Sequence, residues 1–152
     1  MHNERLGDFI IRPAKLSDSE FVYNLRTRNE DSQFYLTGNK ISKKVHVIFW
    51  QKHFSWYYIL ELDSVRVAFL GMVDSDFRFA VVPEQRGKGL GKLMVSYATK
   101  HLGVTQVKVS AYNYASLRCF CENGFTVVNQ HSSEDSDGYF ILRRIENTEK
   151  CI

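Results

Sequence analysis

The sequence contains no apolar run that approaches the roughly 18 residues needed to cross a membrane. Its first ten residues, MHNERLGDFI, also lack the apolar stretch of a secretory signal peptide. Both absences argue against an exported or membrane-spanning protein. We therefore expect a cytoplasmic chain that neither spans nor enters a membrane.

Cysteine is scarce, with three residues that lack the spacing of a zinc site: Cys119, Cys121 and Cys151. Cys119 and Cys121 lie two positions apart on a predicted helix, so their side chains diverge and can neither share a metal nor pair easily. We expect reduced thiols and no metal site.

Strong charge of one sign is also absent, because 20 basic and 17 acidic residues leave a net charge of +3. This excess is too small to indicate nucleic-acid binding, and no extended basic stripe is present. The densest basic cluster is Arg86, Lys88 and Lys92, inside a glycine-rich segment. That position favours a small polyanion as the ligand.

The sequence has the composition of a globular protein, with 44% hydrophobic and 14% aromatic residues, and 152 residues suit one domain over 1–152. Ser17 with Glu20, Ser42 and Gly124 have the positions of helix caps. The order of the predicted strands and helices indicates a mixed α/β sheet. The predicted strands are 8–14, 56–63, 65–74, 77–82, 105–113, 125–131 and 138–145, and the predicted helices are 16–28, 41–54, 93–103 and 114–123.

The segment PEQRGKGLGKLM, residues 83–94, joins a predicted strand to a predicted helix. It is not a Walker loop, because only three residues separate Gly87 from Gly91 and Lys92 is followed by Leu93. It does not fit G-x-G-x-x-G either, since the third glycine comes one residue early. A simple corner is the alternative reading, but three alternating glycines cost folding entropy, which favours a bound anion at the helix N-terminus.

The remaining pattern, P-x-x-R-G-x-G-x-G, resembles the acetyl-CoA pyrophosphate loop of the GNAT N-acetyltransferase superfamily. The resemblance implies an α/β (α+β) fold: a mixed central sheet of about six to seven strands with about four helices, splayed between strands 4 and 5. The opening segment FIIRPAKLSDSEFVYNLR is also similar to the first strand and helix of that family.

A second segment, NYASLRCFCENGF, resembles the next motif of the family, in which an asparagine contacts the pantetheine arm. Acetyl-CoA is thus the expected co-substrate, and no metal is expected. The residues that the resemblance assigns to it are Val81, Val82, Arg86, Gly87, Lys88, Gly89, Leu90, Gly91, Lys92, Asn113, Ser116 and Phe120.

The family polarises the thioester carbonyl with a backbone N–H at the place of Val81 and Val82, which are also suited to be core residues. It often carries the base at the start of the same strand, which here is Asp76. Glu61 and Asp74 are competing carboxylates, and Asp76 also suits a plain turn.

His46 on the second predicted helix is a further candidate on the acceptor side, although histidines at such positions more often pack or lie at the surface. Many members have a tyrosine acid where this sequence has Phe120. The acid is then absent, replaced by solvent, or moved to Tyr112 or Tyr114.

The segment 24–54 resembles the start of bacterial enzymes that acetylate amino sugars carried on nucleotides, through Arg28-Asn29, Phe34-Tyr35 and His46. A sugar or base could stack on Phe34, Tyr35, Trp50 or Trp56, which equally suit a core. Acetylation of a protein N-terminus or another amine, and a non-catalytic acetyl-CoA sensor, are the alternatives. The sequence leaves the oligomeric state open, a homodimer included.

Overall fold

The computed structural model describes residues 3–28, 41–133 and 136–144 of the chain. The strands are β1 (Glu4–Leu6), β2 (Phe9–Pro13), β3 (Tyr57–Leu62), β4 (Val65–Val73), β5 (Asp76–Val81), β6 (Gln106–Ser110), β7 (Phe125–Ser133) and β8 (Ser136–Arg144). The α-helices are α1 (Ser19–Arg26), α2 (Lys43–His53), α3 (Leu90–His101) and α4 (Tyr114–Cys121).

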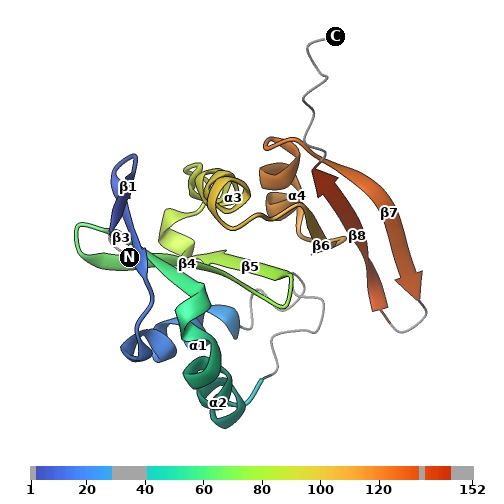
Figure 1. The fold of residues 1–152 in the computed structure, drawn as a ribbon. Helices are drawn as coiled ribbons and strands as arrows, with labels where there is room; N and C mark the ends of the chain where they lie inside the picture. Colours follow the sequence, from blue (N-terminus) through green and yellow to red (C-terminus); the bar gives the residue numbers. More distant parts are fainter. Residues whose placement is uncertain (1–2, 29–40, 134–135, 145–152) are drawn as a thin grey trace.

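The strands form two antiparallel sheets that diverge from one another (Figure 1). One has the order β1-β2-β3-β4-β5 and the other the order β6-β8-β7. The division falls between β5 and β6, which correspond to the predicted strands 4 and 5, so the expected splay is confirmed. The expected single sheet is divided into two at this place, because β5 and β6 share no ladder of hydrogen bonds in the described residues.

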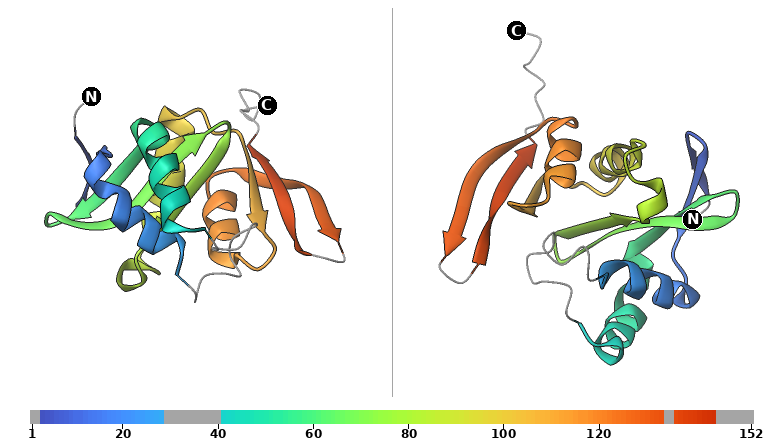
Figure 2. Two further views of the ribbon diagram at one scale, coloured as in Figure 1. Left: turned by 90° about the horizontal axis from the view of Figure 1, so that it is seen from below. Right: turned by 180° about the vertical axis from the view of Figure 1, so that it is seen from behind.

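Helices cover both faces of the five-stranded sheet, as the two views of Figure 2 also show. Alternate side chains of a strand point to opposite faces, so β3 and β4 contribute to two separate cores. Leu60 and Leu70 pack with Met94 of α3 in one core, which continues to α4 and the second sheet. Ile59 and Phe69 pack with Trp50 of α2 in the other.

Two tight turns place β5 beside β4. Asp63 and Ser64 join β3 to β4, and Asp74 and Ser75 join β4 to β5, all four with φ between 50° and 66°. Positive φ at both central residues is the geometry whose twist matches antiparallel strands. The turns fall where the predicted strands 56–63, 65–74 and 77–82 meet, and Asp76, which also suited a plain turn, is the first residue of β5.

The start of α1 differs from the prediction. Leu16–Asp18 is a 3-10 turn, and Asp18, not Ser17, is the N-cap residue of α1; the Asp18 carboxylate accepts the backbone N–H of Lys15 at 2.7 Å. Asp18 is buried, which alone would raise its pKa, but hydrogen bonds from Arg12 and Lys15 outweigh burial and lower that pKa. Ser42 does cap α2 as predicted, by accepting the N–H of Val45.

Candidate active site

The glycine turn between β5 and α3 exposes backbone on its outer side. A 3-10 turn over Pro83–Gln85 leads to Gly87 and Gly89, which have φ of 76° and 84°. A Cβ built on either glycine would meet no atom within 4 Å. Gly89 is the N-cap of α3 and provides no side-chain cap, so no N-cap side chain bonds the first N–H groups of the helix. Such a helix start favours an anion through its free donors and its dipole.

The basic residues of the turn surround this helix start. Lys88 and Lys92 have exposed side chains. Arg86 is exposed as well, and its Nε donates a hydrogen bond of 2.9 Å to the carbonyl of Val81. Arg86 therefore ties the turn back to the end of β5 while its charge stays beside the glycines.

Gly91 has a different role from the other two glycines. A Cβ at this position would lie 2.8 Å from Sγ of Cys119 and 3.4 Å from Cε2 of Phe79. The glycine thus permits α3 to pack closely on α4 and β5. The side chain of Leu90 is also buried, so at this position only the backbone can reach a ligand.

The ladder between β4 and β5 decides which backbone groups of β5 are available. Val81 lies opposite Ala68, and the N–H of Val82 donates to the carbonyl of Val67 at 2.9 Å. Hydrogen-bonded and non-hydrogen-bonded pairs alternate in an antiparallel ladder, so the N–H groups of Phe77, Phe79 and Val81 point away from β4. The expectation that the N–H of Val82 donates to the thioester carbonyl is therefore wrong, because that N–H is already bonded to Val67. Val81 keeps that expectation.

Phe120 of α4 packs against β5 near the place where the two sheets diverge. It is 3% exposed and its ring makes edge contacts with Phe77, Phe79 and Phe125, at centroid distances of 6.2, 5.8 and 5.2 Å. The ring fills the space where the two sheets part, which is a packing position.

Asn113 stands at the start of α4, where its side-chain oxygen accepts the N–H of Ser116 at 3.1 Å and caps the helix. Tyr112 and Tyr114, the alternative acids, are 43% and 72% exposed. Their exposure shows that neither phenol is held in the core, and an acid role for either stays a prediction.

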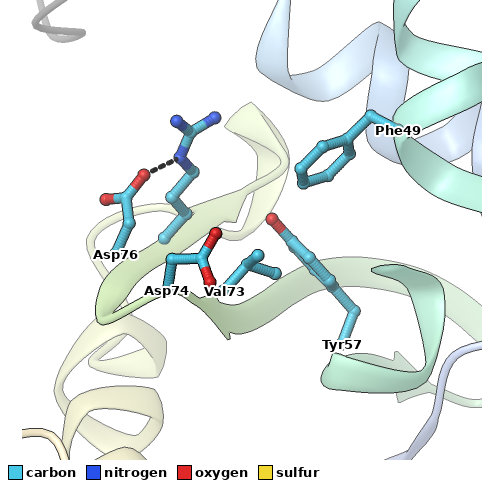
Figure 3. Close-up of a pocket in the computed structure, with 6 residues that line it drawn as sticks. Phe49, Tyr57, Val73, Asp74 and Asp76 are labelled. Carbon is cyan, nitrogen blue, oxygen red and sulfur yellow. Dashed lines mark hydrogen bonds and ion pairs between the residues drawn. The ribbon is translucent and has the colours of Figure 1, made fainter. Parts of the chain in front are cut away.

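A pocket of about 210 Å³ opens on the face of β5 opposite to Phe120, and Phe49 of α2 contributes to its lining. Figure 3 shows the ring of Phe49 and the hydroxyl of Tyr57 directed into the same space, with Asp74 and Asp76 at the strand turn. The ring of Tyr57 lies over Gly71 of β4, where a Cβ would come within 2.5 Å of it. Gly71 therefore leaves the space that the Tyr57 ring occupies. The lining is completed by Val73 and Arg78.

The charges of this pocket are arranged along one face of β5. Asp76 and Arg78 are two positions apart, so they share that face, and Nε of Arg78 contacts Oδ2 of Asp76 at 2.8 Å. Burial raises the pKa of the Tyr57 phenol, while the charges of Arg78 and Arg26 act in the opposite direction. Tyr57 is therefore a neutral hydrogen-bonding group at ordinary pH.

Glu61 is engaged elsewhere. Its carboxylate accepts Nε of Arg12 at 2.8 Å, and both terminal nitrogens of Arg12 bond Asp18 at 2.9 Å. These side chains form a structural network between β2, β3 and the start of α1. Asp74 and Asp76 are the two predicted carboxylates that the structure brings to the pocket.

His46 lies in the core and not on a surface that faces an acceptor. It is 0% exposed, its ring stacks on Trp50, and its Nε2 is 3.0 Å from the carbonyl of Ser19. Since a carbonyl only accepts, Nε2 carries the proton. Burial, together with the charge of Arg26, lowers the pKa of His46, so the ring is neutral at neutral pH.

Of the two candidate stacking tryptophans, one is buried and the other is exposed. Trp50 is 1% exposed and donates from its indole to the carbonyl of Lys15, whereas Trp56 is 62% exposed. Asn29, Phe34 and Tyr35 lie outside the described residues, as does Cys151.

Two cysteines fall within the described part of the chain, and both are free thiols. Burial raises the pKa of Cys119. Over the ranges 3–28, 41–133 and 136–144, no three His, Cys, Asp or Glu side chains gather as metal ligands. None of the helices described is both long and apolar enough to cross a bilayer.

Sequence reasoning missed four residues of the pocket: Phe49, Tyr57, Val73 and Arg78. Arg78 carried a signal, because its spacing of two from Asp76 on a strand puts both on one face. Phe49 and Tyr57 had none, since their meeting depends on how α2 packs on β3.

Comparison with known proteins gives a consistent picture. The model of the acetyltransferase (GNAT) family matches residues 20–125, which is more than half of the chain. None of the curated proteins compared with the sequence matches it.

Solved structures with a similar fold include a spermidine N-acetyltransferase from Vibrio cholerae in complex with CoA and spermine (TM-score 0.72, 14% identity, 89% of this chain and 94% of that one). A ribosomal-protein-S5-alanine acetyltransferase from Vibrio fischeri has a TM-score of 0.68 and 13% identity, over 97% and 98% of the two chains. A GNAT-family acetyltransferase from Streptococcus pneumoniae has a TM-score of 0.68 and 17% identity, over 88% and 96%.

Proposed function

Because the chain belongs to the acetyltransferase (GNAT) family, we propose that it moves the acetyl group of acetyl-CoA directly to a primary amine held in the pocket beside β5. The chain is an N-acetyltransferase, and acetyl-CoA is its co-substrate. The observation that carries the proposal is the position of β5. Its last residues enter the glycine turn, and its first residues line the pocket of Asp76 and Arg78.

The glycine turn is suited to the diphosphate of acetyl-CoA. Gly87 and Gly89 leave open space in front of the N–H groups that begin α3, and Arg86 and Lys88 add positive charge there. The outward N–H groups of Phe79 and Val81 supply donors for the pantetheine arm and the thioester carbonyl along the edge of β5. A backbone donor that faces a developing oxyanion stabilises the transition state.

On the amine side, Asp76 is the proposed base. The amine nitrogen attacks the thioester carbon, the new C–N bond forms, and the C–S bond breaks. The proton released by nitrogen passes to Asp76 directly or through a water, and the departing sulfur takes a proton from solvent. Phe120 has no proton to give, and a thiol with a pKa of about 8.5 leaves readily as the thiolate.

Several classes of amine are candidate acceptors. A nucleotide-linked amino sugar is supported by the sequence resemblance and by the exposed ring of Trp56. The similarity to enzymes that act on spermidine and on a ribosomal protein keeps polyamines and protein N-termini as further acceptors to test.

Acetyl-CoA binding at the turn is tested by Gly89→Asn, because asparagine tolerates a positive φ but places a side chain in the open space. Gly7→Asn is the matched control, since Gly7 has a φ of 64° and equally open surroundings in the β1–β2 turn. We expect calorimetry to show weaker acetyl-CoA binding for Gly89→Asn alone. Equal affinity in both folded variants would contradict the proposal.

A further inference from the structure

We propose that the acceptor amine also carries a carboxylate or a similar anionic group, and that Arg78 binds this group while the amine lies at Asp74 and Asp76. The inference rests on the proposed function and names the class of amine that the same pocket receives. It follows from which nitrogens of Arg78 are engaged, from the balance of charges in the pocket, and from its size.

Arg78 has a donor pair to offer. Its Nε is used by Asp76 at 2.8 Å, but its two terminal nitrogens have no hydrogen-bond partner among the residues that the structure describes. The side chain is 41% exposed, so these nitrogens are accessible from the pocket. The paired N–H groups of a guanidinium match the two oxygens of a carboxylate. The bond to Asp76 holds the guanidinium in place for such a contact.

The charge balance favours an acceptor that bears both signs. An ammonium or amine at Asp74 and Asp76, with an anion on Arg78, satisfies all three charged groups and leaves the Asp76–Arg78 pair intact. A polycationic acceptor satisfies the two carboxylates but places its second charge near Arg78. The charge of Arg26, whose Cζ lies 5.7 Å above the Phe49 ring, opposes a second cation as well.

The size of the pocket suits a compact group at the end of the acceptor that enters it. Its volume of about 210 Å³ is below the roughly 300–1,000 Å³ typical of sites for drug-sized ligands. The apolar walls, Phe49, Tyr57 and Val73, suit a short hydrocarbon chain between the amine and the anionic group. An aminoalkanoate or an α-amino acid fits this description, and only one end of a nucleotide-linked sugar would enter.

The test compares matched amines by the thiol that acetyl-CoA releases. Each aminoalkanoate or amino acid is paired with the alkylamine or amide that lacks the carboxylate, over several chain lengths, and a diamine is included. We expect kcat/KM of the wild-type protein to favour the carboxylate by at least about tenfold, the low end for a charge-assisted hydrogen bond. Arg78→Gln should remove the preference and Arg78→Lys should keep part of it.

The ratio of kcat/KM between paired amines isolates this role of Arg78, because any effect on Asp76 acts on both amines alike. Arg66→Gln is the control, since Arg66 is also 41% exposed and ion-paired, to Asp18, but does not line the pocket. A preference for the diamine, equal rates for paired amines, or a preference that survives Arg78→Gln would overturn the inference.

A failure of the proposed function gives a different result. If no amine releases thiol, the proposed transfer fails, and binding of the aminoalkanoates in the presence of CoA is measured by calorimetry instead. Tighter binding than the matched alkylamines in the wild type, lost in Arg78→Gln, would still support the carboxylate site. No such difference would refute it.

Discussion

Replacement of Gly91 by alanine tests the close approach of α3 and α4. The added Cβ would lie 2.8 Å from Sγ of Cys119, closer than unbonded carbon and sulfur atoms approach. Overpacking of this kind typically costs about 1–3 kcal/mol. Replacement of glycine by alanine in a helix stabilises the folded state by up to about 1 kcal/mol, and by less in the first turn. We therefore expect Gly91→Ala to lower the free energy of unfolding by about 0–3 kcal/mol.

A double-mutant cycle separates the contact from the helix propensity. In a Cys119→Ala background the sulfur is gone, so Gly91→Ala should become neutral or stabilising, a coupling of about 1–3 kcal/mol. Cys121→Ala is the control, because Cys121 is exposed and not among the atoms that the new Cβ would meet. Denaturant unfolding of the single and double variants measures the cycle. Additive effects of Gly91→Ala and Cys119→Ala, within about 0.5 kcal/mol, would refute the reasoning.

Two further changes address the base and the buried histidine. Asp76→Asn should lower turnover strongly at neutral pH and less at high pH, where more of the amine is unprotonated, and Asp74→Asn should lower it less. Thiol release measured across pH 6 to 9 with one amine decides between the two carboxylates. Equal activity of Asp76→Asn and the wild type would show that another group is the base. His46 has a pKa below 6.5 in the folded protein, so on acidification the unfolded chain takes up the proton first. The free energy of unfolding should therefore fall as the pH falls below 6.5. Denaturant titrations of His46→Gln should show a smaller decrease. The same dependence on pH in both proteins would show that His46 does not cause the decrease.

Local patterns predicted most elements of the fold. The apolar segments 56–63 and 65–74, which meet at Asp63-Ser64, predicted β3 and β4 within a residue or two. Strand β1 was missed because Glu4–Leu6 has no pattern of its own and is defined only by pairing with β2. The Ser17 cap was wrong for a related reason, since Asp18, bonded by Arg12 of β2, is the N-cap residue of α1.

The site was predictable where it depends on a continuous motif. The spacing of its glycines singled out the glycine turn, and Asn113 was found through the resemblance of its segment to the family motif, whereas the choice between Val81 and Val82 could not be made from the sequence. It depends on the register of β5 against β4, and a shift of one residue exchanges inward and outward N–H groups. The burial of His46 depends in the same way on how α1 and α2 pack, as its contact with Ser19 shows.

The outward edge of β5 has a consequence for the protein in the absence of its co-substrate. A strand edge with unpaired N–H and C=O groups is a template for a strand from another molecule, and many proteins protect such edges with lysine, proline or a bulge. Along β5, Arg86 bonds the carbonyl of Val81, but Phe77 and Phe79 carry none of these devices. The arm of acetyl-CoA, when it occupies this edge, would also block edge-to-edge pairing with a second copy of the chain. Colloidal stability would then depend on co-substrate concentration, and starvation for acetyl-CoA would favour aggregation.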